Sequence, residues 1–299
     1  MRLKLQNLTM GTAALSLGLG IALSHGSPGS ALDRARHADA DAGGASVASA
    51  FTNAPARLDV SAVRSAPATA ATAAANVRAA KVQGALHALV NLVSKQSHPD
   101  ALKYAFQAYY GFKAAHPEQV RKPYLYFVDY GLDSHTPRGY VFDMDALKVV
   151  DGPFTVAHGR GSGAKDGVPT KFSNVQDSNA SSLGLFVAQE TYAFTGHTGG
   201  RAYHSMGMRM NGVSGRFNDA ARPRKVVVHG APYVTPGKAG RSEGCPAMET
   251  ARADKLIPKI GNGGMVFLFS PLDKQWLSGD PWAAGADAAS AAAIGSLAE

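Results

Sequence analysis

The stretch KVVVHGAPYVTPGKAGRSEGCPAMETARADKLI, residues 225–257, says most about how the chain folds and what it does. It begins with a run of valines that predicts a β-strand ending at His229. A loop with glycine and proline follows, and helical spacing resumes from Cys245. Pro246 suits the first position of a helix, where its missing N–H is not needed, so we expect Cys245 to be the N-cap. His229, at the end of the strand that enters the same loop, can then reach Cys245.

Outside this stretch, the chain after Pro123 consists of short apolar runs separated by glycine, proline, asparagine and aspartate. Runs of this kind, alternating or bounded by turn residues, predict strands. Many short strands with little helix between them favour a mainly antiparallel β-sandwich or barrel-like sheet over a doubly wound parallel sheet. We therefore expect a mainly β domain over residues 123–278, with a few helices. The expected strands lie in YLYFVDY, RGYVFDM, LKVVD, PFTVAH, LGLFVAQE, MGMRM, RKVVVHG and GMVFLFS.

Two segments before this domain predict helices. Residues 77–93 and 100–115 carry apolar side chains at helical spacing, and a break at His98–Pro99 separates them. We expect them to form an α-helical hairpin, within an extension over residues 76–122, that packs on the β domain.

The composition of two other segments predicts no fixed structure. Residues 32–75 consist largely of Ala, Ser, Asp and Gly. Such a segment buries too little apolar surface to offset its chain entropy, so we expect a disordered spacer. Residues 279–299 return to Ala, Gly and Ser and predict a flexible tail.

The first residues predict export. Arg2 and Lys4 precede an apolar run of about 16 residues, which is typical of a secretory signal peptide. We expect residues 1–31 to be this signal, with cleavage at its end and a periplasmic or cell-envelope location; an uncleaved signal would leave a transient membrane association. Cys245 is the only cysteine, and it lies far from the apolar run, so a lipid anchor on a cysteine is excluded.

The formal net charge of +8 fits an anionic polymer as partner. Wall polymers, anionic membranes and nucleic acid all meet this condition. Export and the lack of Lys/Arg runs with interleaved aromatics argue against nucleic acid. A basic surface that only maintains solubility is an equally good interpretation.

The lone cysteine is the first candidate for chemistry, because an unpaired thiol in an oxidising compartment is a liability unless it reacts. A thiol is mostly protonated at neutral pH, so His229 is expected to act as its base. The N–H groups of Gly244 and Cys245 can together bind an oxyanion, and Ser242 can fix the loop. The alternative is a small buried cysteine and an ordinary strand-end histidine.

Three neighbouring side chains are candidates for substrate contacts. Arg241 can bind a peptide carboxylate through its guanidinium fork. Tyr233 can shape the donor pocket, with loop packing as the alternative. Glu243 would raise the pKa of the cysteine if it faced the sulfur, so we expect it to turn toward solvent or toward Arg241.

The remaining histidines are weaker candidates. His158, in HGRGSG, follows another expected strand and could line the same cleft. His197 and His204 flank a glycine-rich loop but have no third ligand at a recognisable spacing. We therefore expect no metal and no organic cofactor.

The segments HGAPYV and GRSEGCPAM, supported by VDYGLDS, HGRGSG, KFSN and SSLGLF, resemble the L,D-transpeptidase (YkuD-like) family over roughly Tyr124 to Ser270. The closest resemblance is to its murein L,D-transpeptidase catalytic-domain branch. This resemblance implies a YkuD-type β fold, with His229 as general base and Cys245 as nucleophile. It also implies that Gly230, Ser242 and Gly244 are flanking motif positions.

This sequence departs from the family pattern at two places. Most members carry a second histidine just before the Gly-Cys pair and often an Arg or Asn soon after it. Here Glu243 and Pro246–Ala247 occupy those positions.

The expected function is therefore that of a peptidoglycan acyltransferase. The resemblance implies that Cys245 forms a thioester with a stem tetrapeptide, releases D-alanine and transfers the acyl group to an amine. Water as acceptor would make the protein an L,D-carboxypeptidase. The sequence is also compatible with a catalytically inactive wall-binding module of the same fold, and with an exported anchoring protein that acts through its spacer and helical hairpin.

Overall fold

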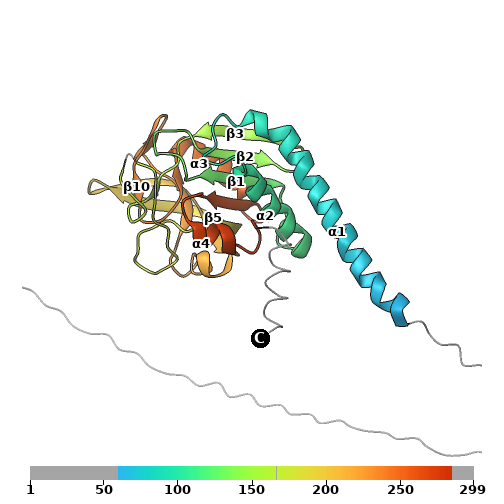
Figure 1. Cartoon of the computed structure of the whole chain (residues 1–299). Coiled ribbons are helices and arrows are strands. Elements are labelled where there is room, and N and C mark those ends of the chain that lie inside the picture. The colour runs from blue at the N-terminus through green and yellow to red at the C-terminus, as the bar shows by residue number, and fades with distance from the viewer. Residues whose placement is uncertain (1–59, 166, 285–299) are drawn as a thin grey trace, which may run out of the picture. The chain divides into compact units, whose positions relative to one another are not determined.

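The computed structural model describes residues 60–165 and 167–284 (Figure 1). The expected signal peptide, most of the expected spacer and most of the expected tail lie outside the described residues. Within the described ranges, none of the helices combines the length and the apolar character that crossing a bilayer requires.

An eight-stranded sheet forms the centre of the described chain, with the strand order β11-β7-β6-β5-β12-β1-β2-β3. Most neighbours are antiparallel, but β1 pairs with β12, and β7 with β11, in parallel. The prediction of a mainly β fold with a few helices is thus confirmed. The strands of this sheet are β1 (Tyr124–Asp129), β2 (Gly139–Asp143), β3 (Lys148–Phe154), β5 (Gly184–Thr198), β6 (Arg201–Gly212), β7 (Val227–Gly230), β11 (Ala247–Met248) and β12 (Met265–Phe269).

Two short strand pairs lie outside this sheet. β4 (His158–Gly159) pairs in parallel with β10 (Arg241–Ser242), and β8 (Val234–Thr235) forms a hairpin with β9 (Lys238–Ala239). The first pair joins two loops that are far apart in the sequence. It therefore fixes the position of the segment that leads to Cys245.

An α-helical hairpin precedes the sheet, as predicted. It consists of α1 (Val60–Leu89), the 3₁₀ turn η1 (Val90–Leu92) and α2 (Ala101–Ala115). α1 begins earlier than expected, so residues 60–75 are helical and not part of a structureless spacer. The reason is that alanine, which is abundant there, has the highest helix propensity, and a helix does not need a large apolar content to form. The remaining helices are η2 (Gly215–Phe217), α3 (Thr250–Ile260) and α4 (Lys274–Gly279).

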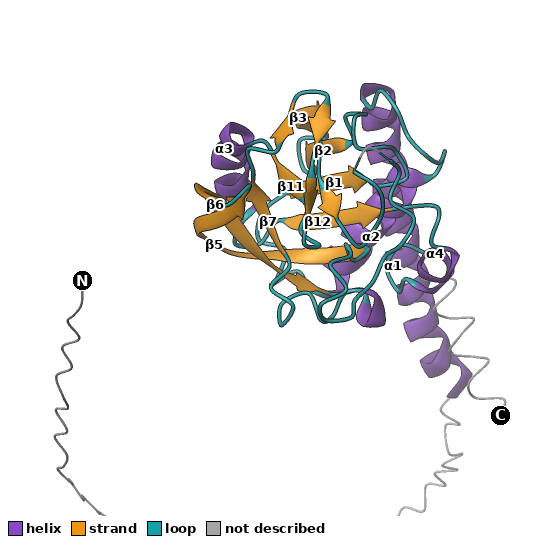
Figure 2. Cartoon of the chain, turned by 90° about the vertical axis from the view of Figure 1, so that its left-hand side faces the viewer, coloured by secondary structure: helices purple, strands orange, loops and turns teal. Residues whose placement is uncertain are grey.

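Helices cover both faces of the sheet (Figure 2). On one face, Phe106 of α2 packs edge-on against Phe142 of β2, with ring centroids 5.7 Å apart. On the other, the guanidinium of Arg252 in α3 lies 4.5 Å from the centre of the Phe154 ring, and Phe154 stacks on Tyr126. The strands between these layers are almost wholly apolar because both of their faces are buried.

Polar contacts also tie the hairpin to the sheet. The N–H and the hydroxyl of Ser97 donate to the buried carboxylate of Asp129, over 2.8 and 2.5 Å. The N–H of Ser94 donates to the hydroxyl of Tyr140 over 3.0 Å, and the Tyr110 hydroxyl donates to the carbonyl of Met144. The hairpin is therefore an integral layer of the domain.

Candidate active site

His229 lies on β7, and Cys245 lies two residues before β11, the strand that pairs with β7. Ala247 of β11 is in register with His229 of β7, and the N–H of His229 donates to the carbonyl of Pro246 over 3.4 Å. The N–H of Val227 donates to Sγ of Cys245, also over 3.4 Å. Both side chains line one cavity of about 650 Å³. The structure thus brings the two residues to the same cavity, as the sequence predicted.

The local structure at Cys245 differs from the prediction. The helix begins at Thr250, with Glu249 at its N-cap, and the residues directly after Pro246 form β11. Cys245 is therefore not the N-cap of α3, and the expected stabilisation of its thiolate by a helix N-terminus is not found in the described part of the chain. The reason is that this segment can pair with the edge of β7, where a proline at the start of a strand costs no ladder hydrogen bond.

His229 is in the form that accepts a proton. Its ring stacks on Phe194 with centroids 4.4 Å apart, and burial lowers its pKa below the usual value. Nδ1 lies 3.0 Å from the carbonyl oxygen of Gly230. A carbonyl only accepts, so Nδ1 carries the proton and Nε2 keeps its lone pair. The imidazole is thus neutral at neutral pH, with Nε2 available as a base.

The thiol of Cys245 is protonated at rest. Burial raises its pKa to about 11, while the Val227 N–H and the charge of Arg224 act in the opposite direction. Glu243 raises this pKa further. No hydrogen bond joins the thiol to His229 within the part of the chain that the structure describes, as is common before a substrate is bound. The thiol therefore needs a base to become a thiolate at neutral pH.

The turn before Cys245 is held by Ser242. Its hydroxyl donates to the carbonyl of Cys245 over 2.6 Å and accepts from the N–H of Gly244 over 3.2 Å. Gly244 has φ of 117°, and a Cβ there would lie 2.9 Å from the carbonyl oxygen of Ala180. The Ser242 hydroxyl thus already engages the Gly244 N–H, one of the two N–H groups expected to bind an oxyanion.

Sequence reasoning did not single out Ser181, which supports the same turn. Its hydroxyl donates to the carbonyl of Gly244 over 3.1 Å and accepts from the N–H of Gly159 over 3.0 Å. The segment SSLGLF resembles the family, but the 63 residues between Ser181 and Gly244 leave no local signal of their contact. Gly230, by contrast, has a packing role: a Cβ there would collide with Ser205 and lie 2.8 Å from Cβ of Ala253 in α3.

Cationic side chains surround the cavity. Arg160, Lys165 and Arg241 all line it, and Glu243 supplies the one carboxylate of the lining among the described residues. Arg241 donates to the carbonyl of Gly163 over 3.1 Å. The Glu243 side chain is 78% exposed, so it turns toward solvent, one of the two expected outcomes; it pairs with Arg160 over 3.5 Å and not with Arg241. The reason is the β4–β10 pairing, which places Arg160 beside the residues that follow Ser242.

The β5–β6 hairpin and Tyr233 form another wall of the cavity. Phe194 and His197 of β5 and Tyr203 of β6 line it. Tyr233 lines it as well and meets Tyr203 edge-on, with centroids 6.3 Å apart. Tyr233 therefore combines a role in the pocket with a role in packing. The sequence predicted strands here, but not that the hairpin extends far enough to reach the site.

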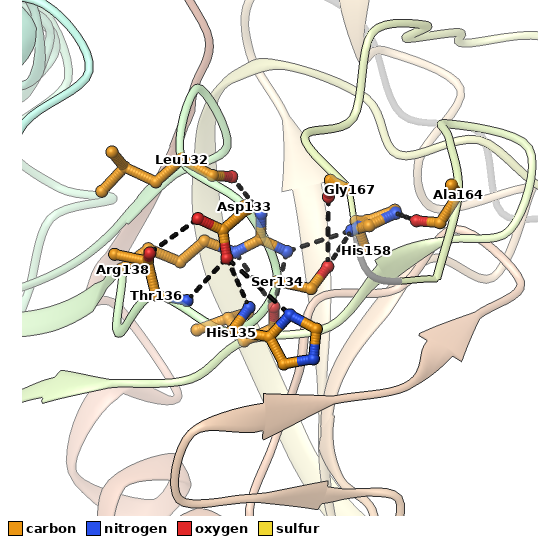
Figure 3. Close-up of polar contacts among 10 residues, drawn as sticks. Leu132, Asp133, Ser134, His135, Thr136, Arg138, His158, Ala164 and Gly167 are labelled. Carbon is orange, nitrogen blue, oxygen red and sulfur yellow. Dashed lines mark hydrogen bonds and ion pairs between the residues drawn. The ribbon is translucent and has the colours of Figure 1, made fainter.

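His158, on β4, does not line the cavity, contrary to expectation, because its side chain is fully buried. Its Nδ1 accepts from Arg138 over 3.0 Å and lies 3.1 Å from the hydroxyl of Ser134, and its Nε2 donates to the carbonyl of Ala164 (Figure 3). Burial, reinforced by the charge of Arg138, lowers the pKa of His158 to about 4. This histidine is a neutral structural residue.

Two further histidines occupy the β5–β6 hairpin. His197 lines the cavity, and His204 shares a hydrogen bond with Thr195 over 3.1 Å. Over residues 60–165 and 167–284 no three His, Cys, Asp or Glu side chains are grouped so that they could hold a metal ion.

Comparison with known proteins identifies one family. A family model described as the L,D-transpeptidase catalytic domain matches residues 93–269, more than half of the chain. A search of curated proteins gives no match.

Solved structures of L,D-transpeptidases are similar at low sequence identity. One from Mycobacterium smegmatis has 16% identity and a TM-score of 0.30, covering 49% of this chain and 58% of that one. L,D-transpeptidase 3 from Mycobacterium tuberculosis has 12% identity and a TM-score of 0.30, covering 49% and 61%. One from Xylanimonas cellulosilytica has 14% identity and a TM-score of 0.29, covering 57% and 79%. The chain thus spans about three fifths of the length of the first two structures.

Proposed function

The chain belongs to the L,D-transpeptidase catalytic-domain family, and from this premise we propose that it is a peptidoglycan L,D-transpeptidase with Cys245 as nucleophile and His229 as general base. One observation carries the proposal. The only cysteine of the chain and a neutral histidine with a free Nε2 line the same cavity. A nucleophile and a base in one cavity form the minimal apparatus of acyl transfer through a covalent intermediate.

In the first half-reaction, Nε2 of His229 takes the thiol proton as the sulfur attacks the carbonyl carbon of the third residue of a stem tetrapeptide. The N–H of Cys245 stabilises the resulting oxyanion. Collapse of this intermediate breaks the peptide bond, and the imidazolium returns its proton to the amine of the departing D-alanine. The product is a thioester on Cys245.

In the second half-reaction, the side-chain amine of another stem attacks the thioester carbonyl and loses a proton to His229. Collapse forms the new amide bond and restores the thiol, with its proton returned from the imidazolium. Water in place of the amine would yield a free carboxylate, which is the L,D-carboxypeptidase outcome.

The charges around the cavity support an anionic peptide as substrate. Arg160, Lys165 and Arg241 are opposed by Glu243 alone among the charged side chains of the described lining. A guanidinium binds a carboxylate more specifically than an ammonium does, because its fork can donate two parallel hydrogen bonds. Arg241 is exposed, and among the described residues its side chain bonds only to a carbonyl, so it is the best placed carboxylate ligand.

The test is product analysis by mass spectrometry with a disaccharide tetrapeptide and the full-length protein. We expect a cross-linked dimer and free D-alanine from the wild type and neither from Cys245→Ala. We expect His229→Gln to be slower by about 100-fold or more, which is the usual contribution of a general base. Tripeptide without dimer would show that water, and not an amine, is the acceptor, so that the protein is an L,D-carboxypeptidase.

The competing function is a wall-binding module without turnover, which the replacement of the usual histidine by Glu243 favours. A penem distinguishes the two, because the family resemblance implies that an active nucleophile is acylated by it. We expect a one-to-one mass adduct on the wild type and none on Cys245→Ala. Absence of both the adduct and cysteine-dependent products would favour the binding module.

A further inference from the structure

The sulfur of Cys245 lies against the turn that leads into β7. The N–H of Val227 donates to Sγ over 3.4 Å, and the thiol faces the carbonyl of Lys225 at 4.0 Å. Lys225 has φ of 59°, a left-handed conformation that bends the chain around the sulfur. Residues 224–227 thus form one side of the nucleophile's surroundings, and Arg224 is the first of them.

Four hydrogen bonds, none of them to a carboxylate, hold the guanidinium of Arg224. It donates to the carbonyls of Ser173 and Ala180, over 2.8 and 2.9 Å, and to the hydroxyls of Ser182 and Ser178, over 2.7 and 3.1 Å. All four acceptors are neutral, and no carboxylate of the described residues pairs with Arg224. The positive charge is therefore fixed in place and not compensated by an ion pair.

Arg222, two residues earlier, shows the opposite arrangement. It donates to both carboxylate oxygens of Glu190 over 3.0 and 2.8 Å and lies at the surface. Two arginines in one turn thus differ in whether a carboxylate neutralises them. This pair offers a variant and its matched control.

Arg224 also lies next to the nucleophile turn. Its Nη2 is 3.7 Å from the position that a Cβ on Gly244 would occupy, and Ala180, whose carbonyl it binds, is 2.9 Å from the same position. Ser181, the next residue in the clamped loop, donates to the Gly244 carbonyl. Loop 173–182 is therefore held between Arg224 and the residue that precedes Cys245.

We propose that Arg224 is a positioning residue for the reaction: its uncompensated charge stabilises the Cys245 thiolate, and its four hydrogen bonds hold loop 173–182 beneath the nucleophile turn. The cation takes the place of the helix N-terminus that Cys245 lacks. The proposal rests on the proposed function only in taking Cys245 as the nucleophile. The direction of the effect of Arg224 on the cysteine pKa, which is downward, agrees with it.

Other titratable groups face the same sulfur or line its cavity and also affect the pKa of Cys245. They are present in every variant, so a comparison between variants isolates the effect of Arg224. They are His229 on β7, His197, Tyr192 and Tyr203 on the β5–β6 hairpin, Tyr130 after β1, and Arg160, Lys165, Tyr233, Arg241 and Glu243 in the loops.

The test measures the reactivity of the thiol itself and does not require turnover. Cys245 is the only cysteine, so intact mass follows its alkylation by iodoacetamide in the full-length protein from pH 6 to 11. We expect Arg224→Gln to raise the apparent pKa of alkylation by about 1 unit, and to slow the reaction about tenfold at pH values below both pKa values. Arg224→Lys should keep most of the wild-type profile, and Arg222→Gln all of it.

A second readout responds to charge and not to loop structure. The anionic reagent iodoacetate is attracted by a cation beside the sulfur, whereas neutral iodoacetamide is not. We expect the ratio of the two alkylation rates to fall in Arg224→Gln and to stay near the wild-type value in Arg224→Lys. Melting temperatures of all variants report any loss of structure.

Superimposable profiles for Arg224→Gln and the wild type would overturn the proposal. So would an Arg224→Lys protein that is folded but shifted by the full unit, because the charge would then be irrelevant. If Arg224→Gln does not fold, Arg224→Lys alone decides between these outcomes. Normal alkylation without any cysteine-dependent product would instead refute the proposed function and leave the role of Arg224 standing.

Discussion

At the scale of single residues, two buried histidines have lowered pKa values but opposite roles. His229, which lines the cavity, donates from Nδ1 to the Gly230 carbonyl, and its Nε2 has no hydrogen-bond partner among the described residues. In His158 both ring nitrogens have partners: Nδ1 contacts Arg138 and Ser134, and Nε2 donates to the carbonyl of Ala164. The number of ring nitrogens without a partner among the described residues, and not burial alone, therefore distinguishes the proposed base from the structural histidine.

His158 makes folding stability depend on pH. Its pKa is about 4 in the folded chain against an ordinary 6.5, so the unfolded chain binds the extra proton between these values. The contribution of His158 is fully present above pH 6.5 and is lost as the pH falls toward 4. The slope approaches about 1.4 kcal/mol per pH unit inside this window.

Urea unfolding of wild type and His158→Gln at about pH 7 and about pH 4.5 measures this contribution. We expect the wild type to lose about 2 kcal/mol more than the variant between the two pH values. Gln can still accept from Arg138 and donate to Ala164, so the packing is preserved. Equal losses in both proteins would contradict the assignment of His158 as the titrating group.

Residues of the site differ in how well the sequence located them. His229 and Cys245 belong to one stretch with a recognisable spacing, and the structure places both in one cavity. Arg224 and Ser181 gave no signal, because their partners lie far away in the chain. His158 was misplaced because a histidine after a strand can point to either side of the sheet, and only tertiary packing decides which.

At the scale of elements, the cysteine loop is fixed by short pairings and not by long elements. β10 pairs with β4 and β11 with β7, over two residues each. The expected helix start at Pro246 failed because strand pairing with β7 competes with local helix propensity, and tertiary contacts override such weak preferences. Gly244, between these two pairings, is the point where the chain must adopt a left-handed conformation.

Alanine substitution of two glycines with positive φ tests whether the turn at Gly244 is required for activity. In Gly244→Ala the added methyl would lie 2.9 Å from the Ala180 carbonyl oxygen, so we expect loss of cysteine-dependent product and about a tenfold or greater fall in alkylation rate. In Gly237→Ala, at φ of 72° in the β8–β9 turn, no atom lies within 4 Å of the new Cβ.

The Gly237 variant is thus a control for backbone strain alone. We expect it to cost about 1 kcal/mol of stability and to leave both activity and alkylation unchanged. Measurement of product formation and melting temperature for the two variants separates the effects. Equal activity in both would show that the turn at Gly244 tolerates a side chain.

At the scale of the whole molecule, the helical hairpin belongs to the catalytic unit. The family match itself begins at residue 93, inside the hairpin region. Asp129 relies on Ser97 for two of its hydrogen bonds, and the aromatic face of α2 covers the sheet. The extension over 76–122 and the domain over 123–278 thus differ in sequence character, but their residues pack together.

Two truncations test this unity. A chain that begins at residue 124 exposes the apolar face of the sheet and leaves Asp129 buried with fewer partners, so we expect no cooperative unfolding transition. A chain that begins at residue 76 keeps every buried side chain of α1 that the structure describes, the first of which is Val82. We expect its melting temperature to lie within about 3 °C of the full-length value, and its activity to be unchanged. Normal activity from the shorter chain would make the hairpin dispensable.

The sequence predicted the fold class and most of the strands, but not the order in which the strands pair in the sheet. Alternating runs predicted most strands because their pattern is local. The order of the strands was not predictable in the same way, because pairing between distant segments leaves no local trace. β12 illustrates this: its run GMVFLFS predicted a strand, but nothing in it indicated a place between β5 and β1.

That place has a consequence for the order of synthesis. β1, β2 and β3 are made first and β5, β6 and β7 later, yet the two groups join only through β12, the last strand. A nascent chain that stops short of residue 265 therefore holds two half-sheets, each with an open edge and neither closed by its neighbour. Completion of the sheet waits until the ribosome has released almost the whole domain.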